Sequence, residues 1–147
     1  RHCNWVRLRD RKSGAEFRVL DIHLDHKSDD ARREQMKMIV GECAQYADGF
    51  PQIICGDFNS GIENAPVACL RDAGWQEAYE AVHGPGEAGF TYHGFKGPDY
   101  RKKNARRIDF IFVRGNLQPV AAEILRDKVD GLYPSDHYFL MSDFIIQ

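Results

Sequence analysis

The chain has 147 residues, of which 43% are hydrophobic and 29% are charged. This composition is typical of one globular domain with a buried core, and it excludes a disordered segment. The net charge of -2 argues against a surface that is basic throughout, although a local basic patch stays open. No apolar run exceeds four residues, which excludes a transmembrane helix and a signal-peptide core. Because the first residue is Arg1 rather than Met, we expect a piece of a longer protein.

The elements expected from the patterning alternate between strands and helices. Strands at residues 4–9 and 17–24 flank a turn at 10–14 and predict a hairpin. An apolar stripe at helical spacing, after the capping residue Ser28, predicts a helix from Asp29 to Ala47. Next come a strand at 52–56, a small helix at 64–74, another helical turn at 75–82, a long functional loop at 84–104, and strands at 107–113, 120–126 and 137–145. This order predicts a mixed α/β fold with helices packed on a sheet.

The four cysteines contain no C-x-x-C pair, so a zinc site built on cysteine is not expected. Cys43 lies on the apolar stripe and Cys55 in an apolar run, which predicts two small buried hydrophobes. Their spacing does not resemble the disulfide framework of a small secreted domain. The cysteines therefore favour a reducing compartment such as the cytoplasm, and the sequence leaves the localisation otherwise open.

Polar residues gather in four short segments at predicted strand ends. The segments are H-L-D-H (23–26), G-D-F-N-S (56–60), R-I-D-F-I-F (107–112) and Y-P-S-D-H (133–137). In an extended chain, residues two apart share a face, so Asp57 and Asn59 can address one point. The alternative for this pair is an Asx turn that ends the strand. The presence of the other three segments favours a site.

Asp109 lies in a strand whose two faces are both apolar. An unpaired buried carboxylate is costly, so Asp109 needs a partner. A histidine that it orients and keeps protonated is the natural one. The alternative is a solvated carboxylate at the rim of the sheet. We expect His137, which opens the last strand, within about 2.6–3.2 Å of Asp109.

Histidines at strand ends, with carboxylates nearby, favour a shared site over unrelated packed or surface residues. Ser135, Asp136 and His137 do not form a serine triad, because consecutive residues of an extended chain point apart. His23 and His26 are expected on opposite faces of a strand end, which leaves only His23 in the site. Oxygen and nitrogen donors of this kind suit Mg²⁺ or Mn²⁺, and the matching reaction is hydrolysis of a phosphate ester.

In this order, the four segments resemble the C-terminal half of the endonuclease/exonuclease/phosphatase superfamily, and H-L-D-H followed by S-D-D-A-R resembles a bacterial branch of it. The resemblance implies a DNase I-like, four-layer αββα sandwich. Residues 1–147 would form a single domain or the C-terminal half of one, an α/β (α+β) unit with a mostly antiparallel sheet and helices on one face. The implied activity is a Mg²⁺- or Mn²⁺-dependent phosphoesterase acting on nucleic acid, a phospholipid head group or a small phosphate ester.

The resemblance also implies a role for each matching residue. Asp57 would position or deprotonate the attacking water, and Asn59 would hold the scissile phosphate. His137, oriented by Asp109, would contact the phosphate. His23 would be a second phosphate-contacting residue.

Further residues match the metal and substrate positions of the family. Asp136 would ligate the metal, directly or through water. Three residues of the long loop would lie on the substrate side: Tyr92, His93 and Phe95. Four basic residues would add phosphate affinity or form only a solvated basic loop: Lys102, Lys103, Arg106 and Arg107.

No segment matches the N-terminal half of the family, which supplies an Asn and the Glu that is the principal metal ligand. We therefore expect that the missing half, or a second copy of this chain, covers the remaining face of the sheet. The alternative to an enzyme is a non-catalytic interaction module or an inactive fragment. Metal-dependent hydrolysis of a phosphodiester separates the two.

Overall fold

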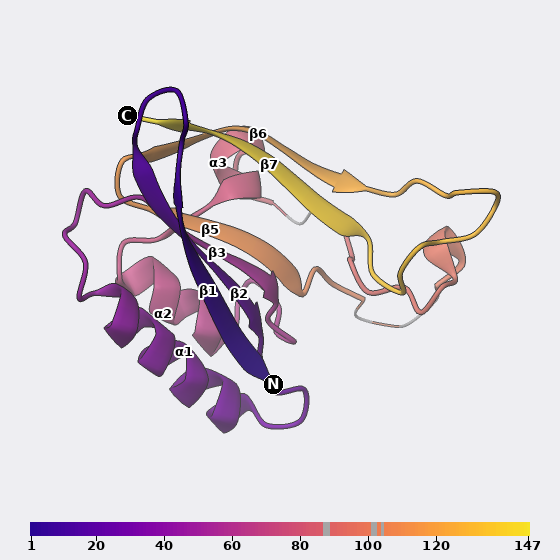
Figure 1. Ribbon diagram of the computed structural model, residues 1–147. Helices are drawn as coiled ribbons and strands as arrows, with labels where there is room; N and C mark the ends of the chain where they lie inside the picture. Colours follow the sequence, from indigo (N-terminus) through magenta and orange to yellow (C-terminus); the bar gives the residue numbers. More distant parts are fainter. Residues whose placement is uncertain (87–88, 101–102, 104) are drawn as a thin grey trace.

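The computed structural model describes residues 1–86, 89–100, 103 and 105–147 (Figure 1). Its strands are β1 (His2–Arg9), β2 (Glu16–His23), β3 (Gln52–Asp57), β4 (Gln76–Glu77), β5 (Asp109–Arg114), β6 (Leu117–Leu125) and β7 (Phe139–Ile146). Its helices are α1 (Asp29–Cys43), α2 (Ala65–Asp72) and α3 (Ala78–His83), with a 3-10 turn η1 (Gly97–Asp99). The mixed α/β architecture expected from the sequence is confirmed. None of the helices in these ranges is long and apolar enough to cross a membrane.

Five strands form the main sheet in the order β1-β2-β3-β5-β4, and β6 and β7 form a separate ribbon. β1 and β2 make the antiparallel hairpin that the turn sequence predicts. β2 and β3 run parallel, so the chain must cross over between them, and α1 lies in this crossover. β5 pairs antiparallel with both β3 and β4. The carboxyl ends of β2 and β3 therefore meet at one edge of a mostly antiparallel sheet.

Helices α1 and α2 cover one face of the main sheet, and they lie side by side below it in Figure 1. The fully buried sheet residues on this face are Leu20, Ile22, Ile54, Phe110 and Phe112. Met36 and Ile39 of α1 and Leu70 of α2 pack against them. Burial of these apolar side chains is the main stabilising term of the fold.

Helix α1 begins as predicted and ends earlier than predicted. The Ser28 hydroxyl accepts a hydrogen bond from the Ala31 N–H at 3.1 Å, which caps the first turn. The helix ends at Cys43, whereas the stripe predicts an end at Ala47. Ala44 and Ala47 are exposed, so neither contributes to the buried stripe. Alanine fits a helical pattern whether or not it is buried, and the pattern therefore overestimates the length.

The four cysteines are free thiols. Cys43 is buried, as predicted, and Cys55 is half-buried. Burial raises the pKa of each of these two thiols to about 11. Both are therefore protonated and unreactive at neutral pH.

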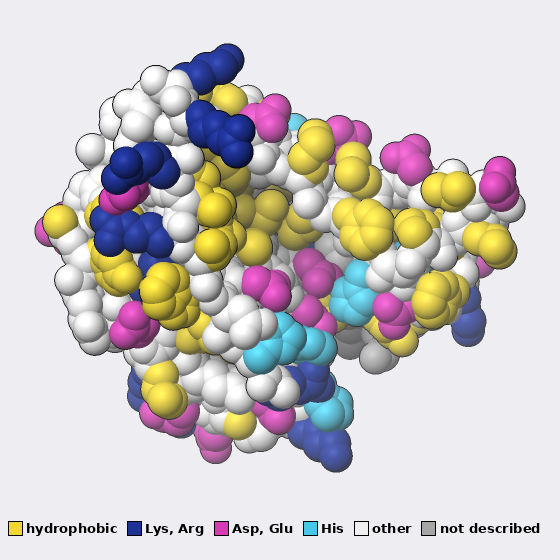
Figure 2. Space-filling view, viewed as in Figure 1, with side chains coloured by type: hydrophobic (Ala, Val, Ile, Leu, Met, Phe, Trp, Pro, Cys, Tyr) yellow, Lys and Arg dark blue, Asp and Glu magenta, His cyan; other side chains and the backbone are white. Residues whose placement is uncertain are grey.

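The opposite face of the main sheet is only partly covered. The register places Val6, Val19, Ile53 and Val113 in one row across β1, β2, β3 and β5. The β6–β7 ribbon covers part of this row with Leu117, Phe144 and Ile146. Val6 stays exposed, and Figure 2 shows hydrophobic atoms lining the hollow between the hairpin and the ribbon. This face is an apolar layer that further protein could cover.

Gly56 allows β3 to pass close to β2 immediately before Asp57. A Cβ at Gly56 would lie 2.0 Å from the carbonyl oxygen of Ile22, and its φ is +133°. We expect Gly56→Ala to lower the free energy of unfolding by roughly 3 kcal/mol or more, since backbone strain and a backbone clash combine. The control is Gly14→Ala, where φ is +75° and nothing lies within 4 Å. Denaturant unfolding of both variants makes the comparison, and equal losses would contradict the clash.

Candidate active site

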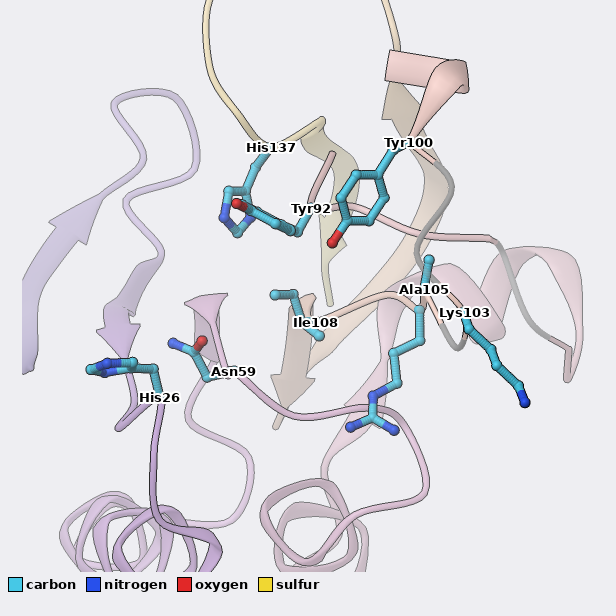
Figure 3. A pocket seen from close by; sticks show the side chains of 9 residues that line it. His26, Asn59, Tyr92, Tyr100, Lys103, Ala105, Ile108 and His137 are labelled. Carbon is cyan, nitrogen blue, oxygen red and sulfur yellow. The ribbon is translucent and has the colours of Figure 1, made fainter. Parts of the chain in front are cut away.

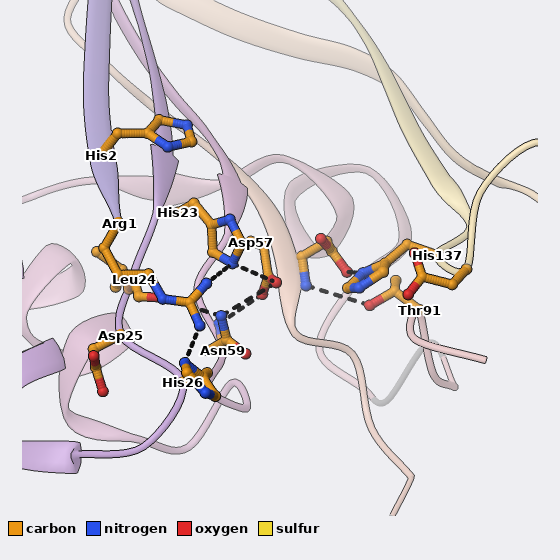
Figure 4. Close-up of polar contacts among 12 residues, drawn as sticks. Arg1, His2, His23, Leu24, Asp25, His26, Asp57, Asn59, Thr91 and His137 are labelled. Atoms are coloured by element: carbon orange, nitrogen blue, oxygen red, sulfur yellow. Dashed lines mark hydrogen bonds and ion pairs between the residues drawn. The ribbon is translucent and has the colours of Figure 1, made fainter. Parts of the chain in front are cut away.

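The strand register carries three of the predicted residues into one row at the edge of the main sheet. His23 is opposite Asp57 in the parallel β2–β3 pair, and Asp57 is opposite Asp109 in the antiparallel β3–β5 pair. Opposed residues in neighbouring strands share a face, so these side chains lie on the face away from α1 and α2. His137, just before β7, approaches the same row (Figure 4).

Asp109 and His137 form the contact that the burial of Asp109 predicts. The Nδ1 atom of His137 lies 2.8 Å from Oδ2 of Asp109, and the side chains are 22% and 16% exposed. The expected separation is thereby confirmed. The Asp109 carboxylate raises the pKa of His137 by accepting this hydrogen bond, with smaller contributions from the Asp57 and Asp136 charges. His137 is therefore stabilised in its protonated form near neutral pH.

Asp57 and Asn59 form a tight local unit where β3 ends. Oδ1 of Asp57 accepts a hydrogen bond from the Asn59 backbone N–H at 2.7 Å, which is an Asx turn. The Asn59 side-chain amide donates to Oδ2 of Asp57 at 3.2 Å and to the carbonyl of Leu24 at 3.1 Å. Burial raises the pKa of Asp57, and the Asp109 charge adds to the increase. The turn and the shared site, which the sequence leaves as alternatives, occur together.

The geometry tests whether a divalent cation fits this row. One ligand atom each from Asp57, Asp109 and His137 lies within 4.8 Å of the other two. Two carboxylates supply the hard oxygen donors that Mg²⁺ and Mn²⁺ prefer. The donor set fits such an ion, although the Asp109–His137 hydrogen bond engages part of it.

Asp136 lies outside this group of three. Its Oδ1 is 3.5 Å from the Ser135 hydroxyl, and its backbone carbonyl accepts hydrogen bonds from His93 and Gly94 at 2.8 and 3.0 Å. The backbone of Asp136 thus joins the S-D-H segment to the aromatic loop.

The structure separates the three loop residues expected on the substrate side. Tyr92 lines a cavity and packs edge-on against the His137 ring, with centroids 5.0 Å apart. His93 is fully buried between Tyr133 and Tyr138, and burial lowers its pKa. Phe95 is exposed and lines a different depression. Only Tyr92 borders the cavity beside His137.

Thr91 is a supporting residue that sequence reasoning missed. Its side chain is fully buried, and its hydroxyl oxygen accepts hydrogen bonds from the N–H groups of Ile108 and Asp109 at 3.1 and 3.3 Å. This contact fixes the start of β5 beside the aromatic loop. The partners are 17 and 18 residues away, so no local pattern could have indicated them.

A cavity of about 540 Å³ opens beside the group of three (Figure 3). Its lining residues are His26, Asn59, Tyr92, Tyr100, Lys103, Ala105, Arg106, Ile108 and His137. This volume suits a small organic ligand. The cavity combines aromatic walls with cationic and amide groups, which is a setting for an anionic ligand with an organic part.

His26 lies at this cavity, contrary to the expectation that only His23 would belong to the site. The strand ends at His23, so the alternation of side chains does not extend to His26. Asp25 accepts hydrogen bonds from the N–H groups of Lys27 and Ser28 and so bends the chain there. The guanidinium of Arg1 contacts both imidazole rings (Figure 4). His23 itself borders Asp57 at 3.4 Å, and burial of its ring lowers its pKa.

The basic residues expected to add phosphate affinity divide into two kinds. Arg107 is fully buried, with both terminal nitrogens 3.2 Å from the Glu77 carboxylate, so it does not reach a substrate. The sequence placed Arg107 in a basic loop because its partner lies 30 residues away. Lys103 and Arg106 line the cavity. Lys102 lies outside the described residues.

The Asp109–His137 contact predicts that the stability of the fold depends on pH. The direction of this dependence follows from the raised pKa of His137. The extra stability is complete below the unfolded value of about 6.5 and is lost as the pH rises through the folded value. We expect Asp109→Asn to lower the pKa of His137 in an NMR titration and to flatten this dependence. Asp48→Asn, at an exposed carboxylate that pairs with Arg114, is the control. An unchanged His137 pKa in Asp109→Asn would contradict the assignment.

Comparisons with known proteins agree with this architecture. The model of the endonuclease/exonuclease/phosphatase family matches residues 3–137. A functionally unknown conserved protein from Enterococcus faecalis V583 superposes with a TM-score of 0.84 at 26% identity, over 99% of this chain and 56% of that one. A mannosyl-6-phosphatase from Bacteroides thetaiotaomicron VPI-5482 superposes with a TM-score of 0.81 at 22% identity, over 97% of this chain and 56% of that one. TDP2 from D. rerio, complexed with a single-strand DNA product, superposes with a TM-score of 0.73 at 18% identity, over 97% of this chain and 62% of that one. No curated protein matches the sequence.

The chain thus spans less than two thirds of the length of these solved structures. The family match includes all four polar segments, from H-L-D-H to S-D-H. Together with the superpositions, it assigns a DNase I-like fold. The protein belongs to the endonuclease/exonuclease/phosphatase family.

Proposed function

We propose that this chain carries the phosphate-handling half of a divalent-metal-dependent phosphoesterase. The observation that carries the proposal is the meeting of Asp57, Asp109 and His137 beside a cavity bordered by Asn59. These residues come from three separate segments of the chain, so their meeting has no local cause. Family membership supports hydrolysis of phosphate esters.

Asp57 is the proposed base. Its raised pKa makes the carboxylate a better proton acceptor than an exposed aspartate. Asn59 and the Asx turn hold the carboxylate in one orientation. Both amide hydrogens of the Asn59 side chain already have acceptors, so we assign Asn59 to the positioning of Asp57. A direct hold on the scissile phosphate would require it to release one of them.

His137 is the proposed electrophile and proton donor at the phosphate. The hydrogen bond to Asp109 favours the protonated ring, in which Nε2 is a further N–H donor. His23, whose pKa is lowered, is the second candidate for contact with the phosphate. His93 is buried, so we propose that it supports the loop rather than the substrate.

Mg²⁺ or Mn²⁺ is the proposed cofactor, with Asp57 and Asp109 as oxygen donors and Asp136 as the ligand that the family resemblance adds. A divalent ion in such a site neutralises charge on a phosphoryl oxygen and lowers the pKa of a bound water. The neighbouring structures include a phosphatase and a protein bound to a DNA product, so both a sugar phosphate and a nucleic acid belong to the candidate substrates.

The exposed sheet face supports the proposal that this half works with a second one. The β1 side chains Val6 and Leu8 and the β7 side chains Phe139 and Met141 are all more than 40% exposed. Monomeric proteins rarely leave large apolar patches exposed. A second half, or a second copy of this chain, would cover it and complete the metal site.

The catalytic proposal is tested in a longer protein that contains this chain and its second half. We expect Asp57→Asn to reduce kcat on a phosphodiester by about 10²–10⁴-fold, because the amide cannot accept the proton. Asp21→Asn, at an exposed carboxylate in the next row of the same face, should change kcat little. EDTA should abolish the activity, and Mg²⁺ should restore it. Activity that survives both EDTA and Asp57→Asn would refute the proposal.

The two-half proposal makes a separate prediction for the isolated 147 residues. They should bind Mg²⁺ only weakly, in roughly the millimolar range, because two carboxylates without the family's glutamate form an incomplete site. Calorimetric titration measures the affinity, and Asp57→Asn should remove the remaining heat. Tight binding together with full turnover by the monomer would show that no second half is needed.

A further inference from the structure

We propose that Arg106 and Lys103 bind a second phosphate group of the substrate, so that the preferred ester carries at least two phosphates. The inference rests on the proposed function, because it takes the end of the cavity at Asn59 and His137 as the place of the reacting phosphate. Figure 3 shows His26, Asn59 and His137 on one side of the cavity and Lys103 on the other. The rings of Tyr92 and Tyr100 lie between the two sides.

Arg106 has a defined position although its side chain is exposed. Gly61 is buried, and a Cβ on it would lie 2.7 Å from Cδ and 2.9 Å from Nε of Arg106. The Arg106 side chain therefore packs directly on the backbone of Gly61, and a larger residue at position 61 would displace it. Gly61 follows the turn of Asp57 and Asn59, so this contact brings Arg106 close to the segment that contains the proposed base.

The charge of Arg106 is available for a ligand. Most arginines of this chain contact a carboxylate, as Arg107 does with Glu77 and Arg71 with Glu80. Within the described ranges, no carboxylate pairs with Arg106 or Lys103. A guanidinium presents a planar set of donors that matches two phosphate oxygens, and a nearby lysine adds a second positive charge. In a chain with net charge -2, two unpaired cations at one cavity point to an anionic ligand.

The middle of the cavity suits the organic part between the two phosphates. Tyr92 and Tyr100 meet edge to face with centroids 5.5 Å apart, and Ile108 lines the cavity beside them. These surfaces can pack against the flat face of a base or a sugar. A simple phosphate monoester would leave the cationic side empty.

The test compares two nucleotides that differ by one phosphate, adenosine 5′-monophosphate and adenosine 3′,5′-bisphosphate. Calorimetry in EDTA prevents turnover and measures binding alone. We expect the bisphosphate to bind about tenfold more tightly than the monophosphate. Arg106→Gln should bring the two affinities within about twofold of each other. Arg33→Gln, at an exposed arginine on α1, should leave the ratio unchanged.

Gly61→Ala provides a second variant that keeps Arg106 itself. The φ of Gly61 lies outside the left-handed region, so alanine suits the backbone and only the flexible arginine must move. In Gly61→Ala, the ratio of the bisphosphate affinity to the monophosphate affinity should fall toward the ratio in Arg106→Gln. A ratio near one in the unmodified protein, no binding of either nucleotide, or an unchanged ratio in Arg106→Gln would overturn the inference. An active hydrolase with no preference for the bisphosphate would overturn it while the proposed function stands.

Discussion

A half-buried carboxylate, Asp109, dictates how three distant segments of this protein meet. It lies at the start of β5 in the main sheet, where little water can solvate its charge, and it requires a polar partner. His137 provides that partner from the segment before β7. Thr91 accepts hydrogen bonds from the N–H groups of Ile108 and Asp109, and Tyr92 packs on the histidine ring. The sheet, the aromatic loop and the ribbon are therefore fastened together at the site.

This arrangement also shifts the pKa values of neighbouring groups in different directions. Burial and the nearby Asp109 charge raise the pKa of Asp57, whereas the hydrogen bond to Asp109 raises that of His137. The pKa of His23 is lowered, because burial of its ring outweighs the opposing effect of the Asp57 charge. Three neighbouring groups whose pKa values are shifted in different directions thus lie at one edge of the sheet. Burial and the carboxylates of Asp57 and Asp109 are the main causes of the three shifts.

The candidate site lies where the apolar sheet face ends, so its surroundings depend on what covers that face. The helices bury the central strands of one face, while the ribbon covers only part of the other. The row that continues this second face is the row of His23, Asp57 and Asp109. Protein that covers the exposed face would consequently also border the site. The same addition would provide burial for the sheet and further groups around Asp57, Asp109 and His137.

The sequence determined whatever depends on neighbouring residues: the hairpin, the start of α1, and the need of Asp109 for a partner, with the Asx turn of Asp57 as one of two alternatives. Alternation within a strand and hydrogen bonding to nearby backbone are local, so the printed order of residues contains them. Only the tertiary structure decided that His26 borders the cavity, that Arg107 pairs with Glu77 inside the protein, and that Arg106 packs on Gly61. These contacts depend on the crossover between β2 and β3 and on strand register, which bring together residues tens of positions apart.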